Sequence, residues 1–156
     1  MFFWFLGGAL FVVWQVLHDP RFDVRLLMAA AILPDVVDAP FGKARLGHTL
    51  LASVALLAIV MIATKRGSTR RRHLLALPFG TFLHLVLDGG WGKTFWWPVG
   101  GLAFPGDPIP SFDRSPVLTA VMELAGLAVL VWAWRRGHLG DPARRRMFWR
   151  EGTIAL

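Results

Sequence analysis

Five apolar segments, separated by short polar or glycine- and proline-rich stretches, constrain the fold of this chain more than any other feature. They cover Phe2–Leu17, Val24–Leu33, Gly47–Thr64, Leu74–Asp88 and Pro116–Trp134. A helix needs about 17–25 mainly apolar residues to cross about 30 Å of hydrocarbon, and the third and fifth segments are long enough. The second and fourth are short and are expected to tilt or to extend at their ends. We therefore predict an all-α, polytopic membrane helix bundle with about five membrane segments.

The composition agrees with a membrane protein and excludes several classes of site. Hydrophobic residues make up 55% of the 156 residues, the mean hydropathy is +0.52, and only 17% are charged, whereas a soluble domain carries about a quarter charged residues. Without cysteine, neither a disulfide framework nor a thiolate site can form. The net charge of +7 is compatible with nucleic-acid binding, but the basic residues flank apolar segments, so no nucleic-acid partner is predicted.

The distribution of Lys and Arg predicts an orientation for the five segments. If all five cross and the N-terminus lies outside, 13 of the 17 Lys and Arg residues fall inside, as the positive-inside rule requires. The C-terminus is then cytoplasmic. We predict a membrane-embedded domain over residues 1–134 and a basic cytoplasmic tail over residues 135–156, in a protein of the cell membrane whose partners are lipids.

Five ionisable residues are expected to meet at the outer ends of three predicted helices. Asp35 and Asp38 end the second segment, His48 opens the third, and His84 and Asp88 close the fourth. The last two are four residues apart and share a helix face. Carboxylate oxygen and imidazole nitrogen are ligands of Zn²⁺ when no thiol is present, and Mn²⁺ or Mg²⁺ also accept carboxylates. We predict a site for one or two divalent ions, with Zn²⁺ the expected metal and Mn²⁺ or Mg²⁺ as alternatives.

Each of these residues also has a structural interpretation when it is considered alone. Asp35 can simply end a helix, and a single histidine such as His84 is more often a packed, hydrogen-bonded residue than a ligand. However, ionisable residues inside membrane segments are costly and usually functional. Their convergence at one depth therefore favours a metal site.

Three residues are candidates for catalysis. Asp38 is the candidate general base if it is left uncoordinated, and Glu123 is either a base or a hydrogen-bond partner of a neighbouring helix. Arg45 is a candidate clamp for a substrate phosphate, with contact to lipid headgroups as its alternative. His18 and Asp19 are left out of the site because Asp19-Pro20 reads as the start of a helix; this exclusion assumes that the second segment crosses fully.

The same motifs resemble those of the membrane-bound metal-dependent hydrolases, also described as LexA-binding, inner-membrane-associated putative hydrolases. The matching stretches lie in the family's order and are Leu33–Asp38, Gly47–Leu51, Gly80–Asp88 and Trp97–Pro98. The resemblance implies a helical membrane protein with a metal-dependent hydrolase site, distantly similar to zinc-dependent phospholipase C.

The function expected from the sequence is that of a metal-dependent hydrolase, a phosphoesterase acting on a lipid or polyprenyl phosphate at the extracytoplasmic face. Paired ions or a single ion would activate water for such a reaction. Two alternatives remain open. One is a non-catalytic membrane adaptor with a structural metal site, and the other is an ion-coupled carrier.

Overall fold

The computed structural model describes residues 1–17 and 22–154, and the described chain is built from helices without a β-strand. The all-α prediction is confirmed. The longer helices are α1 (Phe3–Leu17), α4 (Leu50–Ala63), α6 (Ala76–Asp88), α8 (Pro116–Arg136) and α9 (Pro142–Glu151). The short ones are α2 (Val24–Ala30), α3 (Leu33–Asp38), η1 (Ala39–Phe41), η2 (Leu46–His48), α5 (Thr69–Leu74) and α7 (Pro110–Asp113).

The prediction of about five membrane segments is wrong. Within the described residues, only α8 is both long and apolar enough to cross a membrane. With 15 residues in α1 and 14 in α4, these helices rise only about 21–22 Å at 1.5 Å per residue. The inside and outside assignments assumed five crossings, so the predicted orientation loses its basis.

The second apolar segment fails as a single helix for a local reason. Asp23 caps the start of α2, where its side chain accepts hydrogen bonds from the amides of Arg25 and Leu26. Pro34 lies in the first turn of α3, where its missing N–H costs least, whereas in a continuous helix it would remove a hydrogen bond. The segment therefore divides into α2 and α3, and Asp35 lies in the first turn of α3.

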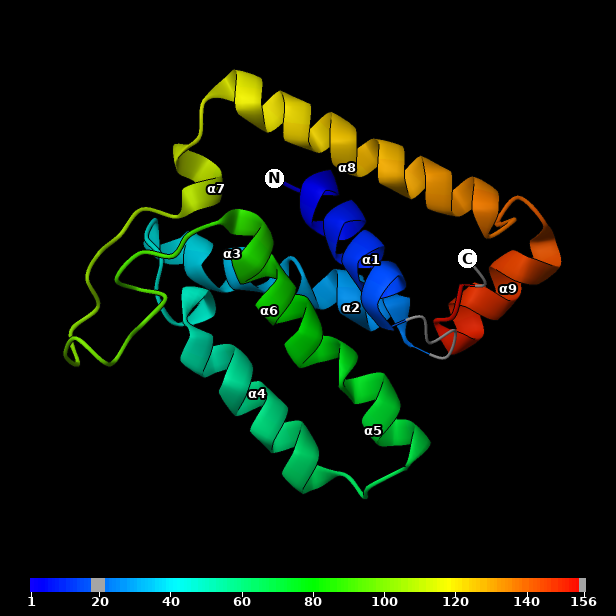
Figure 1. Cartoon of the computed structure of the whole chain (residues 1–156), viewed down its shortest axis with the longest axis horizontal. Coiled ribbons are helices and arrows are strands. Elements are labelled where there is room, and N and C mark those ends of the chain that lie inside the picture. Colours follow the sequence, from blue (N-terminus) through cyan, green and yellow to red (C-terminus); the bar gives the residue numbers. More distant parts are fainter. Residues whose placement is uncertain (18–21, 155–156) are drawn as a thin grey trace.

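Helix α6 occupies the centre of the fold and packs against α1, α2 and α4 (Figure 1). The core around it contains the buried side chains of Phe5, Leu27, Ala76 and Leu83. Gly80 allows α6 to approach α2 closely, since a Cβ there would lie 2.5 Å from the carbonyl oxygen of Leu27. The C-terminal end of α6 carries His84 and Asp88, so this packing fixes the position of both side chains.

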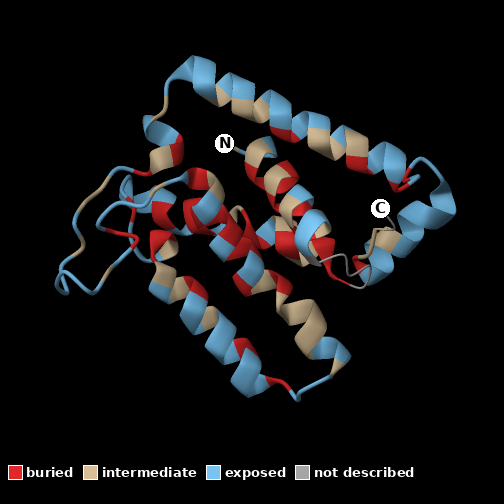
Figure 2. Ribbon diagram, in the orientation of Figure 1, coloured by how far each residue is buried: buried red, intermediate tan, exposed pale blue. Residues whose placement is uncertain are grey.

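Helix α8 lies along one side of the molecule and contacts mainly α1. Only 11% of its most apolar 18-residue stretch is buried, and Figure 2 shows most of the helix exposed. Large apolar side chains are also exposed on α4, where Ile62 is 86% exposed. Apolar surface on this scale is unusual for a monomer in water.

Helix α9 folds back beside the start of α2 (Figure 1). The amide of Val24 donates to the carbonyl of Gly152 at 2.8 Å, and Phe148 packs against a small core that contains Leu10 and Ala133. Gly152 has φ +73°, and a Cβ there would lie 2.1 Å from Oδ1 of Asp23. Only glycine fits at this position, which joins the C-terminal segment to the rest of the fold.

Candidate metal centre

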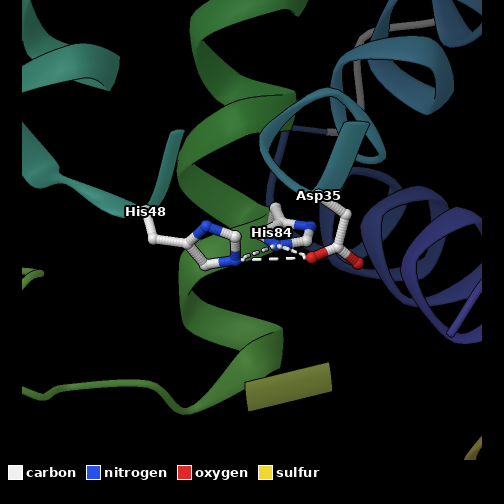
Figure 3. Close-up of side chains that lie close together, drawn as sticks. All are labelled: Asp35, His48 and His84. Atoms are coloured by element: carbon white, nitrogen blue, oxygen red, sulfur yellow. Dashed lines mark hydrogen bonds and ion pairs between the residues drawn. The ribbon is translucent and has the colours of Figure 1, made fainter. Parts of the chain in front are cut away.

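Asp35, His48 and His84 come from three elements and meet in the interior of the protein (Figure 3). Nε2 of His48 lies 3.4 Å from Oδ1 of Asp35, and Nε2 of His84 lies 3.6 Å from the same oxygen. The two Nε2 atoms are 3.4 Å apart. All three residues are buried, and their ligand atoms lie within 4.8 Å of one another. This buried group can bind a metal ion.

A hydrogen bond holds each of the three side chains, and for the two histidines it is made on the ring side away from the group. Nδ1 of His48 lies 2.8 Å from Oδ2 of Asp38, and Nδ1 of His84 lies 2.8 Å from the carbonyl oxygen of Ala31. An imidazole that donates from Nδ1 presents the lone pair of Nε2, which is the form that a metal needs. The hydroxyl of Ser111 lies 3.0 Å from both carboxylate oxygens of Asp35.

Local structure explains why His48 and His84 are so well fixed. Thr49 caps the start of α4 by accepting a hydrogen bond from the amide of Ala52 at 3.1 Å, which places His48 just before the helix. The ring of Phe5 on α1 stacks on the ring of His84 with 4.1 Å between centroids. His84 is fully buried, and α1 covers its ring on the side of Phe5.

The buried setting shifts the charge balance of the histidines in opposite directions. Burial alone would lower the pKa of His48, but hydrogen bonds to Asp35 and Asp38 outweigh it and raise the pKa to about 9. Burial dominates at His84 and lowers its pKa to about 4. Without a metal ion, the carboxylates therefore favour a proton on His48, and a divalent cation at Nε2 would replace the positive charge of that proton.

Asp88 stands at the edge of the group and is 1% exposed. Its Oδ2 lies 3.7 Å from Nε2 of His48, and Oδ1 lies 3.4 Å from the guanidinium of Arg114. Neither oxygen has a hydrogen-bond partner within the described chain. Burial raises the pKa of Asp88 to about 6, although Arg114 opposes the shift. A buried carboxylate without a donor is expensive, so its position calls for a ligand or a water molecule.

A cavity of about 400 Å³ adjoins this edge of the group. His48 and Asp88 line it from the metal centre, and Arg114 lines it from the segment before α8. Gly89 and Gly90, which follow α6, bring backbone rather than side chains to the wall. The ligand group is therefore next to a space large enough for a small phosphate ester.

The other sequence-predicted residues are not at the group. Asp38 is fully buried behind His48, where it also accepts hydrogen bonds from the amides of Arg45, Gly47 and His48. With its oxygens occupied in this way, it is placed to orient His48 and not to bind the ion or take a proton from substrate. His18 and Asp19 lie outside the described residues.

The side chains of Arg45 and Glu123, the other predicted catalytic residues, make their contacts away from the metal group. The guanidinium of Arg45 lies 4.5 Å from the centre of the Phe41 ring and is absent from the cavity wall, so it is not placed to clamp a substrate there. Glu123 accepts hydrogen bonds from the amides of Phe2 and Phe3. Both of its oxygens cap the start of α1, as expected for an acidic side chain near a helix N-terminus.

Sequence reasoning missed Arg114 and Ser111, which reach the site from beyond the loop that follows α6. Besides its contact with the carboxylate, Arg114 donates to the main-chain carbonyl of Asp88. Nothing in the local sequence Ser111-Phe112-Asp113-Arg114 specifies contact with α3 or α6. The only available signal was a cluster of polar residues between two apolar segments.

Comparison of the chain with protein-family models, with curated proteins and with solved structures found no match. The resemblance to the membrane-bound metal-dependent hydrolases therefore rests on its four short motifs.

Proposed function

We propose that the protein is a metal-dependent hydrolase that cleaves a phosphate ester carried by a lipid or polyprenyl chain. The observation that carries this proposal is the buried group of Asp35, His48 and His84 beside a cavity that Asp88 and Arg114 also line. Three protein ligands leave a coordination position for water or substrate, as in catalytic zinc sites. Two nitrogens and one oxygen favour a single Zn²⁺, with Mn²⁺ or Mg²⁺ as alternatives.

The bound ion would lower the pKa of water toward neutrality and neutralise charge on a phosphoryl oxygen. Asp88 takes the proton from the attacking water, because its carboxylate is free of donors and has a raised pKa. The water oxygen forms a bond to phosphorus, the bond from phosphorus to the ester oxygen breaks, and Asp88 passes the proton that it took from water to the departing ester oxygen. Arg114 holds a phosphoryl oxygen through the guanidinium hydrogens that Asp88 does not use. The general-base role predicted for Asp38 passes to Asp88.

A membrane location is part of the same proposal. Helix α8 is the candidate span, and the apolar side chains exposed on α4 and α8 suit contact with lipid. A substrate with a lipid or polyprenyl chain would then reach the site from the bilayer.

The proposal is tested by hydrolysis assays on the full chain purified in neutral detergent. The protein is stripped with a chelator, reloaded with Zn²⁺, Mn²⁺ or Mg²⁺, and given phosphatidic acid, a phosphodiester lipid and a polyprenyl phosphate. His84→Ala should lose both metal and turnover. Asp88→Asn should keep the metal and lose about 10²–10⁴-fold in turnover. Asp113→Asn removes an exposed carboxylate from the same cavity wall and serves as the matched control.

A structural metal site is the second candidate function, because Asp88 stands close enough to close the coordination. Its Oδ2 is 3.7 Å from Nε2 of His48, and a small shift would make it a fourth ligand of a closed site. In that case His84→Ala lowers thermal stability, and no lipid ester is hydrolysed with any of the three metals. That result would overturn the hydrolase proposal.

A further inference from the structure

A second cavity, of about 590 Å³, lies at the opposite end of the molecule from the metal centre, where α8 ends. Its walls have two chemical characters. Ala128, Val131 and Trp132 form an apolar side, and Arg135 and Arg136 form a cationic side next to the imidazole of His138. Apolar residues therefore come first along α8, and cationic residues follow in its last turn.

Every residue that lines the cavity belongs to α8 or to the turn after it, and aromatic contacts with α1 hold two of these residues in place. Trp132 packs edge to face against Trp14 of α1 with 4.7 Å between ring centroids. The guanidinium of Arg136 lies 5.9 Å from the centre of the Trp14 ring. These contacts hold Trp132 of the apolar side next to Arg136 of the cationic side.

The cationic side forms no ion pair with a carboxylate in the part of the chain that the structure describes. Arg135 and Arg136 are exposed and form no ion pair there. Asp141, the next carboxylate along the chain, accepts a hydrogen bond from the amide of Ala143 and caps α9. His138 is also held at φ 50°, a conformation that is costly for a residue other than glycine.

Helix α9 adds to the positive charge at this end. Five residues separate it from the end of α8, and it carries four exposed arginines, which are Arg144, Arg145, Arg146 and Arg150. Basic residues that follow directly on a membrane helix attract anionic lipid, and each contributes about 1 kcal/mol near the surface.

We propose that this cavity binds an anionic phospholipid, with the phosphate between Arg135 and Arg136 and an acyl chain along Ala128 and Val131. The two chemical characters of the cavity and its place at the end of the candidate span match a lipid whose charged head follows an apolar chain. The inference rests on the proposed membrane location and is independent of hydrolysis at the metal centre.

Native mass spectrometry of the full chain, released from neutral detergent with equal phosphatidylglycerol and phosphatidylcholine, tests the site. The wild type should retain phosphatidylglycerol preferentially. Replacing Arg135 and Arg136 by glutamine should reduce that retention by about 30-fold, from two lost charges. Ala128→Trp should reduce it without any change in charge, because the indole fills the apolar side.

The matched control replaces Arg145 and Arg146 of α9 by glutamine, which removes the same charge outside the cavity wall. It should reduce retention much less than the Arg135 and Arg136 double variant, and an equal loss would show diffuse attraction and overturn the site. Equal retention of the two lipids, or equally tight binding of glycerophosphoglycerol without acyl chains, would also contradict the proposal. His84→Ala should keep the lipid preference, so failure of the hydrolase proposal is distinguishable from failure of this one.

Discussion

At the scale of single residues, His48 lies between two carboxylates, one beside each of its ring nitrogens. Asp35 lies on its Nε2 side at 3.4 Å, and Asp38 lies on its Nδ1 side at 2.8 Å. Only the Nε2 side faces His84. The two aspartates therefore have different roles, although they lie three residues apart in one short helix.

Asp38→Asn should weaken metal binding by about 10–100-fold, the usual effect of losing a carboxylate behind a histidine ligand. The amide of asparagine accepts a hydrogen bond from Nδ1 of His48 only through its oxygen, whereas either carboxylate oxygen of Asp38 can accept. The imidazole of His48 is therefore held less firmly in one orientation. Metal affinity is measured by competition with a chromogenic chelator. Asp113→Asn is the control, and an affinity equal to that of the wild type in Asp38→Asn would refute the orienting role.

Asp23 makes the stability of the protein depend on acid pH. Burial alone would raise its pKa, but hydrogen bonds from Arg25, His73 and the amide of Leu26 outweigh it and hold the pKa below 3.8. Because the pKa of Asp23 is lower in the folded state, its ionised carboxylate stabilises the protein at pH values above the pKa of an aspartate in the unfolded chain, about 3.9. This contribution is lost as the pH falls through the lower folded value.

Asp23→Asn should therefore lower the free energy of unfolding by about 1–3 kcal/mol at neutral pH. The difference from the wild type should shrink below about pH 4. Denaturant titrations of both proteins across the acid range provide the measurement. A difference that stays constant from neutral to acid pH would mean that the charge of Asp23 contributes nothing.

At the scale of helices, α1 and α8 pack through glycine. A Cβ at Gly126 would lie 2.1 Å from the carbonyl oxygen of Phe3, and one at Gly7 would lie 2.3 Å from the carbonyl oxygen of Gly126. Small residues at such crossings allow backbones to touch. The position of α1 in turn decides where Phe5 stacks on His84.

Gly126→Ala should cost about 1–3 kcal/mol of stability by overpacking this crossing. It should also weaken metal binding, because α1 must move and carries Phe5 with it. Thermal unfolding and chelator competition report the two effects. Gly100→Ala, at a loop position with open space around it, should change neither, and full stability in Gly126→Ala would contradict the close crossing.

The helices themselves could be predicted from the sequence better than their lengths and their contacts. The apolar segments indicated helices. The ends of three of these predicted helices were expected to bring Asp35, His48 and His84 together, and the three residues do meet, although the five crossings assumed in that prediction are absent from the described residues. Hydropathy could not reveal that the second segment breaks at Ala31 and Ile32, between α2 and α3, or that α1 and α4 are too short to cross a membrane. The contacts of Arg114 and Glu123 depend on long-range packing, which local sequence does not encode.

At the scale of the whole molecule, α6 and its neighbours separate two chemical regions. The metal group lies at the C-terminal end of α6, and the basic residues of α8 and α9 lie toward the other end of the molecule (Figure 1). This separation lets each region be altered without the other. The proposed function requires that the metal group binds an ion.

Elemental analysis of the purified full chain, before and after dialysis against Zn²⁺, tests that claim most directly. We expect one bound ion per chain, lost in His84→Ala and in His48→Ala and retained in Asp113→Asn. Circular dichroism confirms that the variants stay helical. Substoichiometric metal in the wild type after loading, or equal metal content in His84→Ala and the wild type, would contradict the account.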